Sequence, residues 1–355
     1  MSHCKILKAL PIALIFSVMI ILSACGNGNG YYSQTGSDIE VTGSIDDTTL
    51  VIYTTFSSEF TAPIIELFEE RYNIIVELHQ DSTASTLARL RSEEQNPQAD
   101  VMWGGRMYDV APDMDLFQDF VTEHEMHLVP GHENIEGALT RFVTNAGLLI
   151  INTDLLGDIE IRGYECLLNP ALYGQIAMVY PSASSLSFSH LVNQLYAMGR
   201  GHPHNGWIFV TQFITNMGGI ILTNSEAVHT GVSNGDFIVG LTYEDAFLPY
   251  AEANPHVKIV YMNEGVVPDA TVVGIVNGAI NLEGAEAFIS FVTSYEVQAF
   301  IQANLNRRSV RWDVATTGVP VANREINWIP ADIEYVLWNM HFWTERFWSL
   351  WMLHN

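Results

Sequence analysis

Short, mostly apolar runs alternate with amphipathic segments over residues 50–103. Runs that are typical of buried strands lie at 50–53, 74–78 and 99–103. Between them, apolar residues recur at helical spacing, as at Ile64 and Phe68. This strand–helix–strand–helix–strand order predicts a parallel sheet with right-handed crossovers.

The same alternation resumes later in the chain. Further apolar runs that predict strands lie at 147–152, 176–180, 237–242 and 257–261. Residues 283–304 contain an amphipathic helical segment. The chain has 355 residues, more than one hydrophobic core usually supports. We therefore expect an α/β protein of two lobes, with sheets rich in parallel pairs, flanking helices and a ligand cleft between the lobes.

Small hydroxyl residues gather where three of the predicted strands end. They are Ser57 and Ser58, Ser82 and Thr83, and Ser184, Ser185 and Ser187. Parallel α/β sheets bind ligands at the carboxyl ends of their strands, where helix N-termini attract negative charge. The clusters therefore predict an anion site. N-capping of the helices is the alternative use of the same hydroxyl groups.

The N-terminal segment has the organisation of a secretory signal. Two lysines precede an apolar run at 9–22 that is short for a membrane span, and small residues lead up to Cys25. Residues 22–25, LSAC, resemble the lipobox of bacterial lipoproteins, in which the cysteine is diacylated. We expect a signal at 1–24, lipidation of Cys25, and a flexible polar tether at 25–47. An ordinary cleaved signal is the alternative.

The charge of the chain excludes some classes of partner. There are 15 Lys and Arg residues against 40 Asp and Glu residues, a formal net charge of −25. The predicted signal holds two lysines and no acidic residue, so its removal gives −27. Nucleic-acid binding needs clustered cations, and anionic lipid would repel such a chain. We therefore expect an extracytoplasmic protein that is held at the membrane by its lipid.

Signals for catalysis or a resident metal are weak. Outside the signal and the lipobox, Cys166 is the one cysteine, which excludes a disulfide or CxxC site and predicts a buried residue. The sequence has no GxSxG, Walker or HExxH motif. His202 and His204 flank a proline in a Gly-rich stretch that we expect to be a loop. We predict a binding protein, without cofactor or metal site, rather than an enzyme.

Several separate segments resemble the solute-binding proteins of ABC transporters, in the branch that binds ferric iron or phosphorylated organic solutes. They are residues 96–105 (NPQADVMWGG), 239–245 (VGLTYED), 257–261 (VKIVY), 264–265 (EG), 267–269 (VPD) and 278–297. Their order and spacing agree over about residues 48–315. The resemblance implies a periplasmic-binding-protein-like fold of type II, whose lobes close on a solute and deliver it to a permease with its ATPase. We expect a monomer.

The resemblance also implies which residues face the cleft besides the hydroxyl clusters. From the first lobe these are Trp103, Gly104 and Gly105, with a core position as the alternative for Trp103. From the second lobe they are Thr242, Tyr243, Glu244 and Asp245. Arg89, Arg91 and Arg106 are candidate charge partners, although we expect all three on solvated helix faces.

Two classes of ligand fit the resemblance. Ferric-binding relatives use adjacent tyrosines, whereas the corresponding position here reads Tyr243-Glu244-Asp245. This form is more similar to relatives that bind phosphonates or phosphorylated sugars and acids. We therefore expect a small anionic organic solute whose phosphoryl group is held by the serine turns. Ferric iron bound by Tyr243 and Glu244 is the alternative, and a surface sensor or adhesin lipoprotein is a third possibility.

The boundaries of the lobes and the C-terminal segment complete the expectations. We assign one lobe to 48–147 with about 268–310, and the other to 148–267 with about 311–355.

Near the C-terminus, aromatic residues at helical spacing predict a helix that begins near Ala331; they are Trp338, Phe342, Trp343, Phe347 and Trp351. We expect this aromatic face to dock on the protein's own lobe, with a permease or membrane contact as the alternative.

Overall fold

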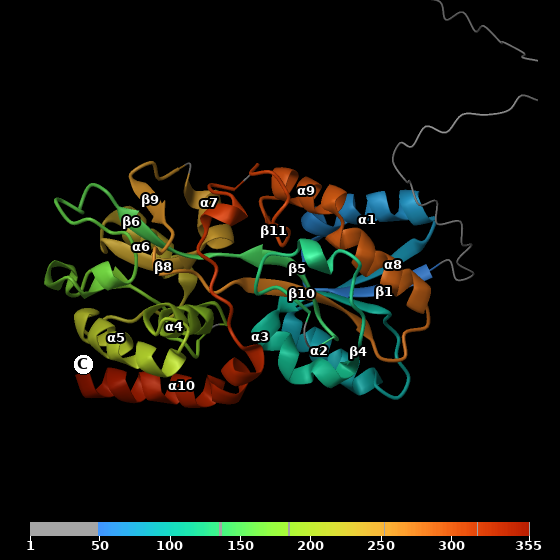
Figure 1. The fold of residues 1–355 in the computed structure, drawn as a ribbon, viewed down its shortest axis with the longest axis horizontal. Coiled ribbons are helices and arrows are strands. Elements are labelled where there is room, and N and C mark those ends of the chain that lie inside the picture. Colours follow the sequence, from blue (N-terminus) through green and yellow to red (C-terminus); the bar gives the residue numbers. More distant parts are fainter. Residues whose placement is uncertain (1–48, 135–136, 184, 252, 318, 355) are drawn as a thin grey trace, which may run out of the picture. The chain divides into compact units, whose positions relative to one another are not determined.

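The computed structural model describes residues 49–354 except 135–136, 184, 252 and 318 (Figure 1). The predicted signal, Cys25 and the tether therefore lie outside the described residues. Two β-sheets flanked by helices form the described part, one with seven strands and one with four. The α/β class that the sequence predicts is confirmed.

The seven-stranded sheet contains three parallel strands where the first apolar runs predict them. β1 (Thr49–Thr54) pairs in parallel with β2 (Ile75–Gln80) on one side and β3 (Val101–Arg106) on the other. α1 (Ser58–Tyr72) and α2 (Thr83–Glu93) connect these strands. β1 and β3 bury most of their side chains, which explains their continuous apolar runs.

Apart from these three strands and one pair in the four-stranded sheet described below, all strand pairs are antiparallel, so the expectation of sheets rich in parallel pairs is wrong for them. β10 (Asp269–Val276) lies between β3 and β5 (Thr140–Asn145) and is antiparallel to both. β11 (Arg308–Ser309) and β4 (Phe117–Gln118) also pair in antiparallel fashion, with β5 and β10 respectively.

The four-stranded sheet has the order β7-β8-β6-β9. β6 (Gly147–Asn152) is antiparallel to β8 (Val239–Tyr243) and β9 (Val257–Val260), and β7 (Ile176–Ala177) is parallel to β8. Its helices are α4 (Ser185–Met198), α5 (Pro203–Asn216), α6 (Ser225–Asn234) and α7 (Glu244–Ala251). Only Ala146 separates β5 from β6, so the chain passes directly from one sheet to the other.

Two helical regions differ from the sequence-based expectation. The stretch around His202 and His204 is not a loop, because α5 begins at Pro203, and proline suits the first position of a helix. Residues 283–304 form two helices, α8 (Leu282–Thr293) and α9 (Tyr295–Asn304), and Ser294 between them caps α9 by accepting a hydrogen bond from the Val297 N–H at 3.4 Å.

The remaining short helices complete the described chain. They are α3 (Met107–Val110) and the 3₁₀ turns Ala111–Leu116, Glu125–His127, Glu165–Leu168, Pro170–Leu172 and Asn323–Glu325. Within the described ranges, no helix is long and apolar enough to cross a membrane.

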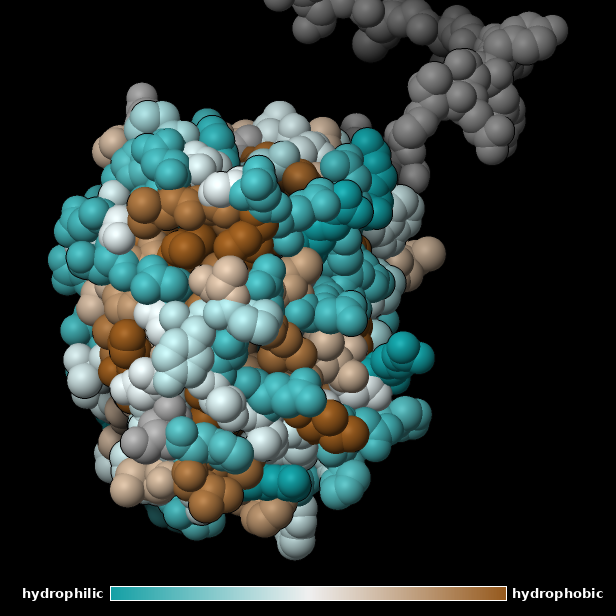
Figure 2. All heavy atoms as spheres, turned by 90° about the vertical axis from the view of Figure 1, so that its left-hand side faces the viewer, coloured by the Kyte–Doolittle hydropathy of each residue, from teal (hydrophilic) through white to brown (hydrophobic). Residues whose placement is uncertain are grey.

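The C-terminal helix α10 (Ile333–His354) packs on its own chain, as expected. Trp343, Phe347 and Trp351 are buried in the core of the four-stranded unit, next to α5. Trp338 and Phe342 do not join them and are 87% and 57% exposed. One residue of rotation, about 100°, separates their row from the buried one. Figure 2 shows the face that carries the C-terminal end of α10, where polar side chains separate the hydrophobic patches.

Candidate functional site

A cavity of about 400 Å³ lies where the carboxyl ends of β1 and β3 meet the N-terminal ends of α2, α4 and α7. We call it the main cavity. Its lining residues are Thr55, Phe56, Ser82, Thr83, Gly105, Arg106, Asp109, Val143, Thr144, Asn145, Ser185, Asp245, Asp269, Thr271 and Arg307. Elements of both sheet units therefore contribute to one site.

Hydroxyl groups form the side of the main cavity next to β1 and α2. Ser82 is the N-cap of α2, and its Oγ accepts a hydrogen bond from the Ser85 backbone N–H at 3.2 Å. The Thr55 Oγ1 accepts a hydrogen bond from the Gly105 N–H at 3.0 Å. The N–H groups of the first helical turn, which begins at Thr83, have no partners inside the helix. The start of α2 therefore offers hydrogen-bond donors and the positive end of a helix dipole to an anion.

Two glycines bring the end of β3 close to these hydroxyl groups. Gly105 has a φ of +89°, and a Cβ on it would lie 2.6 Å from a methyl carbon of Val110 and 3.1 Å from one of Thr83. Gly104 has a φ of +115°, and its Cβ would lie 2.3 Å from Thr55 Oγ1. A side chain at either position would therefore strain the backbone and displace the walls beside the cavity.

Both arginines of the main cavity are paired with carboxylates. Arg106 pairs with Asp269, and these side chains are 17% and 2% exposed. Arg307 pairs with Asp245, and here the exposed fractions are 35% and 24%. Asn145 donates a second hydrogen bond to Asp245. Any anion in this cavity therefore meets guanidinium groups that already have a partner.

The expected position on a solvated helix face holds for two of the three candidate arginines. Arg89 and Arg91 lie on α2, with side chains that are 44% and 41% exposed. Arg106 is different, because it is the last residue of β3 and its side chain is mostly enclosed. The sequence gives no sign of this pairing, since Asp269 lies 163 residues further along the chain.

The cavity also contains carboxyl groups in unusual surroundings. Burial raises the pKa of Asp269, and the nearby Arg106 guanidinium acts in the opposite direction. Burial also raises the pKa of Asp109, while a hydrogen bond from Ser185 and the charge of Arg106 lower it. Within the described residues, no ion pair is formed by Asp109. The main cavity thus combines two guanidinium groups with three carboxyl groups.

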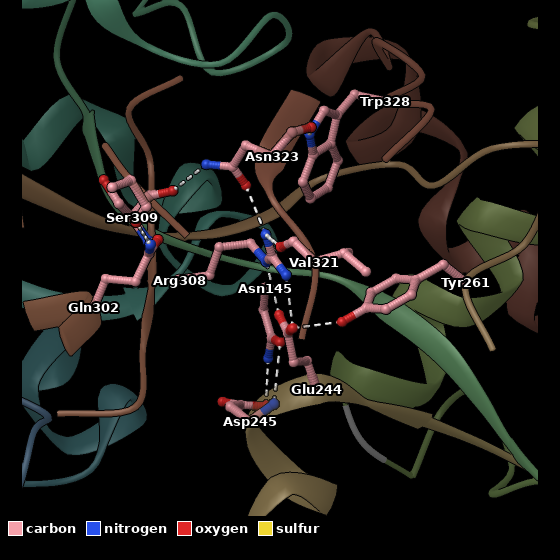
Figure 3. Close-up of polar contacts among 11 residues, drawn as sticks. Asn145, Glu244, Asp245, Tyr261, Gln302, Arg308, Ser309, Val321, Asn323 and Trp328 are labelled. Atoms are coloured by element: carbon pink, nitrogen blue, oxygen red, sulfur yellow. Dashed lines mark hydrogen bonds and ion pairs between the residues drawn. The ribbon is translucent and has the colours of Figure 1, made fainter. Parts of the chain in front are cut away.

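Glu244 lies beside the main cavity in a buried network (Figure 3). Arg308 donates to both of its carboxylate oxygens, each at 2.7 Å, and the Tyr261 hydroxyl donates to Oε1 at 2.5 Å. The Arg308 and Glu244 side chains are only 1% and 3% exposed. Arg308 also donates to the Asn323 Oδ1 at 3.0 Å. The Glu244 carboxylate therefore joins the start of α7 to β11 and does not face the cavity.

The structure brings some of the predicted site residues together and leaves others elsewhere. Ser82, Thr83, Gly105, Ser185 and Asp245 line the main cavity. Ser57 and Ser58 are exposed at the start of α1. The residues that are buried outside the lining are Trp103, Gly104, Ser187, Thr242, Tyr243 and Glu244. Ser184 lies outside the described residues.

The buried predicted residues have clear structural surroundings. The Trp103 ring is in the core, with its centroid 5.4 Å from Phe142 and 5.2 Å from Phe288. The Tyr243 ring packs on His190 with centroids 4.7 Å apart. Burial raises the pKa of Tyr243 well above its ordinary value, so its phenol is protonated at neutral pH.

Nine residues of the lining were not among the predicted ligand-binding residues. They are Thr55, Phe56, Asp109, Val143, Thr144, Asn145, Asp269, Thr271 and Arg307. Most of them belong to β5 and β10, which were not among the predicted strands. A usable signal was present, because Asn145 ends β5 and Asp269 begins β10, so that each strand carries a polar residue at its cavity end.

The lining does not have the composition of a metal site. Among the described residues that line the main cavity, none is a tyrosine, histidine or cysteine. Over the described ranges, no group of three or more His, Cys, Asp or Glu side chains is arranged to hold a metal ion. Hydroxyl, amide, guanidinium and carboxyl groups dominate instead, and these suit hydrogen bonding to an organic anion.

A family model described as bacterial extracellular solute-binding protein matches residues 64–326. Among curated proteins, the iron uptake protein A1 of Synechocystis sp. (strain ATCC 27184 / PCC 6803 / Kazusa) is 28% identical over 271 residues. The match covers 68% of this chain and 74% of that protein.

Two solved structures share the fold. An ABC transporter structure from Clostridium perfringens ATCC 13124 has a TM-score of 0.73 at 17% identity, covering 85% of this chain and 99% of that one. The periplasmic binding protein AfuA from Actinobacillus pleuropneumoniae, with fructose-6-phosphate bound, has a TM-score of 0.65 at 19% identity, covering 86% and 99%. The fold is therefore that of the α/β periplasmic binding proteins, with two sheets flanked by helices.

Proposed function

Because the chain belongs to the family of bacterial extracellular solute-binding proteins, we propose that it captures a small phosphorylated or phosphonate organic solute for an ABC import system. The family consists of binding proteins, so the chain is not an enzyme. The similarity to the Clostridium structure, which is that of an ABC transporter, supports a permease and its ATPase as partners.

The observation that carries the proposal is the set of anion-binding groups in the main cavity. The α2 N-terminus presents the N–H groups of its first turn beside the hydroxyls of Ser82 and Thr83. Arg106 and Arg307 add charge-assisted donors. A phosphoryl or phosphonate group accepts hydrogen bonds in several directions, which matches donors from different walls. The volume of about 400 Å³ suits a small molecule.

The three carboxyl groups indicate what the rest of the solute carries. Asp109, Asp245 and Asp269 accept hydrogen bonds, so they suit a solute with hydroxyl groups or an amine next to the anionic group. Inorganic phosphate would compete with Asp269 and Asp245 for their arginine partners and has few donors to offer the three carboxyl groups in return. An organic solute with both kinds of group is therefore the better fit.

Ferric iron is the second candidate, because the iron uptake protein A1 of Synechocystis is a relative at 28% identity. In this chain the tyrosine that we considered for iron, Tyr243, is buried and protonated. Glu244 is held by Arg308 and Tyr261. An iron site would have to break both arrangements, whereas the fructose-6-phosphate bound to AfuA supports a phosphoryl solute on the same fold.

We place the lobes at the boundaries that the sequence suggests, 48–147 with about 268–310 and 148–267 with about 311–355. The division of the strands between two sheets and the packing of α10 on the four-stranded unit support this placement. Closure of the lobes would then enclose the main cavity. We further propose that the protein is a monomer and is anchored outside the cytoplasm by a lipid on Cys25.

A thermal-unfolding panel tests the proposal with 2-aminoethylphosphonate, fructose 6-phosphate, 3-phosphoglycerate, inorganic phosphate and ferric citrate. A compound at a hundred times its Kd adds about 2.7 kcal/mol to the free energy of unfolding, a shift of several degrees. We expect an organic phosphoryl compound to raise the midpoint and ferric citrate not to. A shift with ferric citrate alone, with a coloured phenolate complex, would move the assignment to Tyr243. No shift with any compound would reject both ligand classes.

A further inference from the structure

The C-terminal helix forms part of a second cavity. The match to the family model ends at residue 326, and α10 begins at Ile333, so this helix lies beyond the matched region. A cavity of about 470 Å³, which we call the side cavity, lies against it. Its lining residues are Tyr108, Asp109, Pro181, Ser182, Ser185, Phe188, Leu337, Met340, His341 and Thr344.

The side cavity adjoins the main cavity. Asp109 and Ser185 line both of them. A hydrogen bond joins these two side chains, so they form the boundary between the two spaces. A solute with its anionic group near the start of α2 would reach α10 by passing over this pair.

The walls of the side cavity have a different chemistry from those of the main cavity. Phe188, Leu337 and Met340 supply apolar surface, and the lining contains no lysine or arginine. The Tyr108 hydroxyl is closed off from solvent, so only the ring of this residue borders the cavity. Asp109 and Ser185 are the polar side chains at the end next to the main cavity. The lining therefore suits a group that is mostly apolar.

The wall that α10 contributes is held firmly in place. Leu337 also packs against the core of the seven-stranded unit, whereas Trp343 and Phe347 are buried in that of the four-stranded unit. The Tyr108 ring meets Phe188 edge to face, with centroids 5.8 Å apart. The side cavity is thus bounded by parts of the molecule that are fixed by other contacts.

We propose that the side cavity binds an uncharged, mainly apolar tail of the same solute, and that Leu337 and Met340 of α10 select for this tail. The inference rests on the proposed function, because it assumes that the anionic group of the solute occupies the main cavity. The solute class is thereby narrowed to phosphoryl or phosphonate compounds with a short, uncharged organic tail.

Alkyl phosphates of increasing length test this inference by calorimetric titration of the protein. We expect the Kd to fall two- to fourfold per methylene from methyl to butyl phosphate, in line with the burial of apolar surface. Met340→Gln should reduce this gain and leave methyl phosphate binding unchanged. Met352→Gln is the matched control, because Met352 lies on the same helix, is 63% exposed and is outside the cavity.

A second variant covers the case in which Met340→Gln disturbs the fold. Thr344→Val exchanges a hydroxyl group of the lining for a methyl group, so it should increase the gain per methylene while leaving the Kd of methyl phosphate unchanged. Equal Kd values along the series, or equal losses in Met340→Gln and Met352→Gln, would overturn the side-cavity inference and leave the proposed function standing. If a compound of the thermal-unfolding panel binds and no alkyl phosphate does, only the side-cavity inference is overturned; if neither set binds, both are overturned.

Discussion

Two neighbouring ion pairs connect β11 and the residue before it with the start of α7, and their surroundings are opposite. Arg308 and Glu244 are 1% and 3% exposed and are surrounded by further hydrogen bonds, whereas Arg307 and Asp245 are 35% and 24% exposed and line the main cavity. The residues of each set are adjacent in sequence, so composition does not distinguish them. Burial distinguishes the two pairs. The enclosed guanidinium of Arg308 stabilises the fold, whereas the more exposed guanidinium of Arg307 can exchange its carboxylate partner for a ligand.

The largest expected effect comes from breaking the buried pair. Arg308→Gln would leave the Glu244 carboxylate buried without its countercharge, so the free energy of unfolding should fall by about 3–5 kcal/mol. Urea denaturation followed by circular dichroism measures this loss. Arg324→Gln is the control, since Arg324 is exposed and makes no ion pair within the described ranges. A loss below about 1 kcal/mol for Arg308→Gln would remove the distinction between the two pairs.

The second largest effect is expected from His190, a buried neutral histidine next to β8, the strand that leads into α7. His190 lies 2.7 Å from the Thr242 carbonyl oxygen, two residues before Glu244, and burial lowers its pKa from 6.5 to about 4. Between these values the unfolded chain binds a proton that the folded protein does not, so stability falls as the pH falls.

The low pKa of His190 should decrease the free energy of unfolding by about 2 kcal/mol between pH 6.5 and pH 5. Denaturant titrations at several pH values measure the slope. His190→Gln should reduce it but not abolish it, because burial lowers the pKa of His132 to about 3 and gives a similar contribution. His204→Gln, which changes an exposed histidine, should leave it unchanged. An unchanged slope in His190→Gln would show that the buried imidazole does not control acid sensitivity.

The exposed pair should affect binding more than folding. Arg307→Gln should change the free energy of unfolding by less than about 1 kcal/mol, because the pair is partly solvated. It should weaken the binding of an organic phosphate by about tenfold or more, since a charge-assisted donor is lost. Calorimetry and urea denaturation on the same sample separate the two effects. A large stability loss with unchanged affinity would reverse the roles assigned to the pairs.

The smallest effect is expected to have the opposite sign. Asp245 competes with a bound anion for Arg307, so Asp245→Asn should raise the affinity for inorganic phosphate about two- to fivefold. Inorganic phosphate is the suitable probe because it has few donors that the lost carboxylate could accept. Titration in low salt measures the change, which should shrink as added salt screens the charges. Weaker binding in this variant would show that Asp245 contacts the anion through a different group.

How much of the fold the sequence reveals depends on the surroundings of each strand. β1, β3, β6 and β8 are buried along their lengths and were predicted from their apolar runs. β5 is equally central, but it ends in the polar residues Thr144 and Asn145, because it reaches the main cavity. The polar pattern that hid this strand also makes it part of the site. β10 carries an apolar run at 270–276, so a signal for this strand was present and was not used.

The candidate site was predictable only in its local elements. The hydroxyl turn at Ser82 and Thr83 could be found because a helix start has a short-range signature. The pairing of Arg106 with Asp269 and that of Arg307 with Asp245 could not, since the partners lie 163 and 62 residues apart. Tyr243 shows that a local pattern can also mislead. It ends a strand and was predicted as a ligand-binding residue, but its side chain is buried in the core.

The position of α10 in the chain also determines when one of the hydrophobic cores can be completed. A chain is made from its N-terminus, and all strands of both sheets precede α10 in the described chain. The residues that close the core of the four-stranded unit, Trp343, Phe347 and Trp351, are therefore synthesised after the strands that they cover. A nascent chain of this protein keeps one of its hydrophobic cores open until α10 has been made. For a member of an extracellular family, that delay favours passage across the membrane before folding is complete.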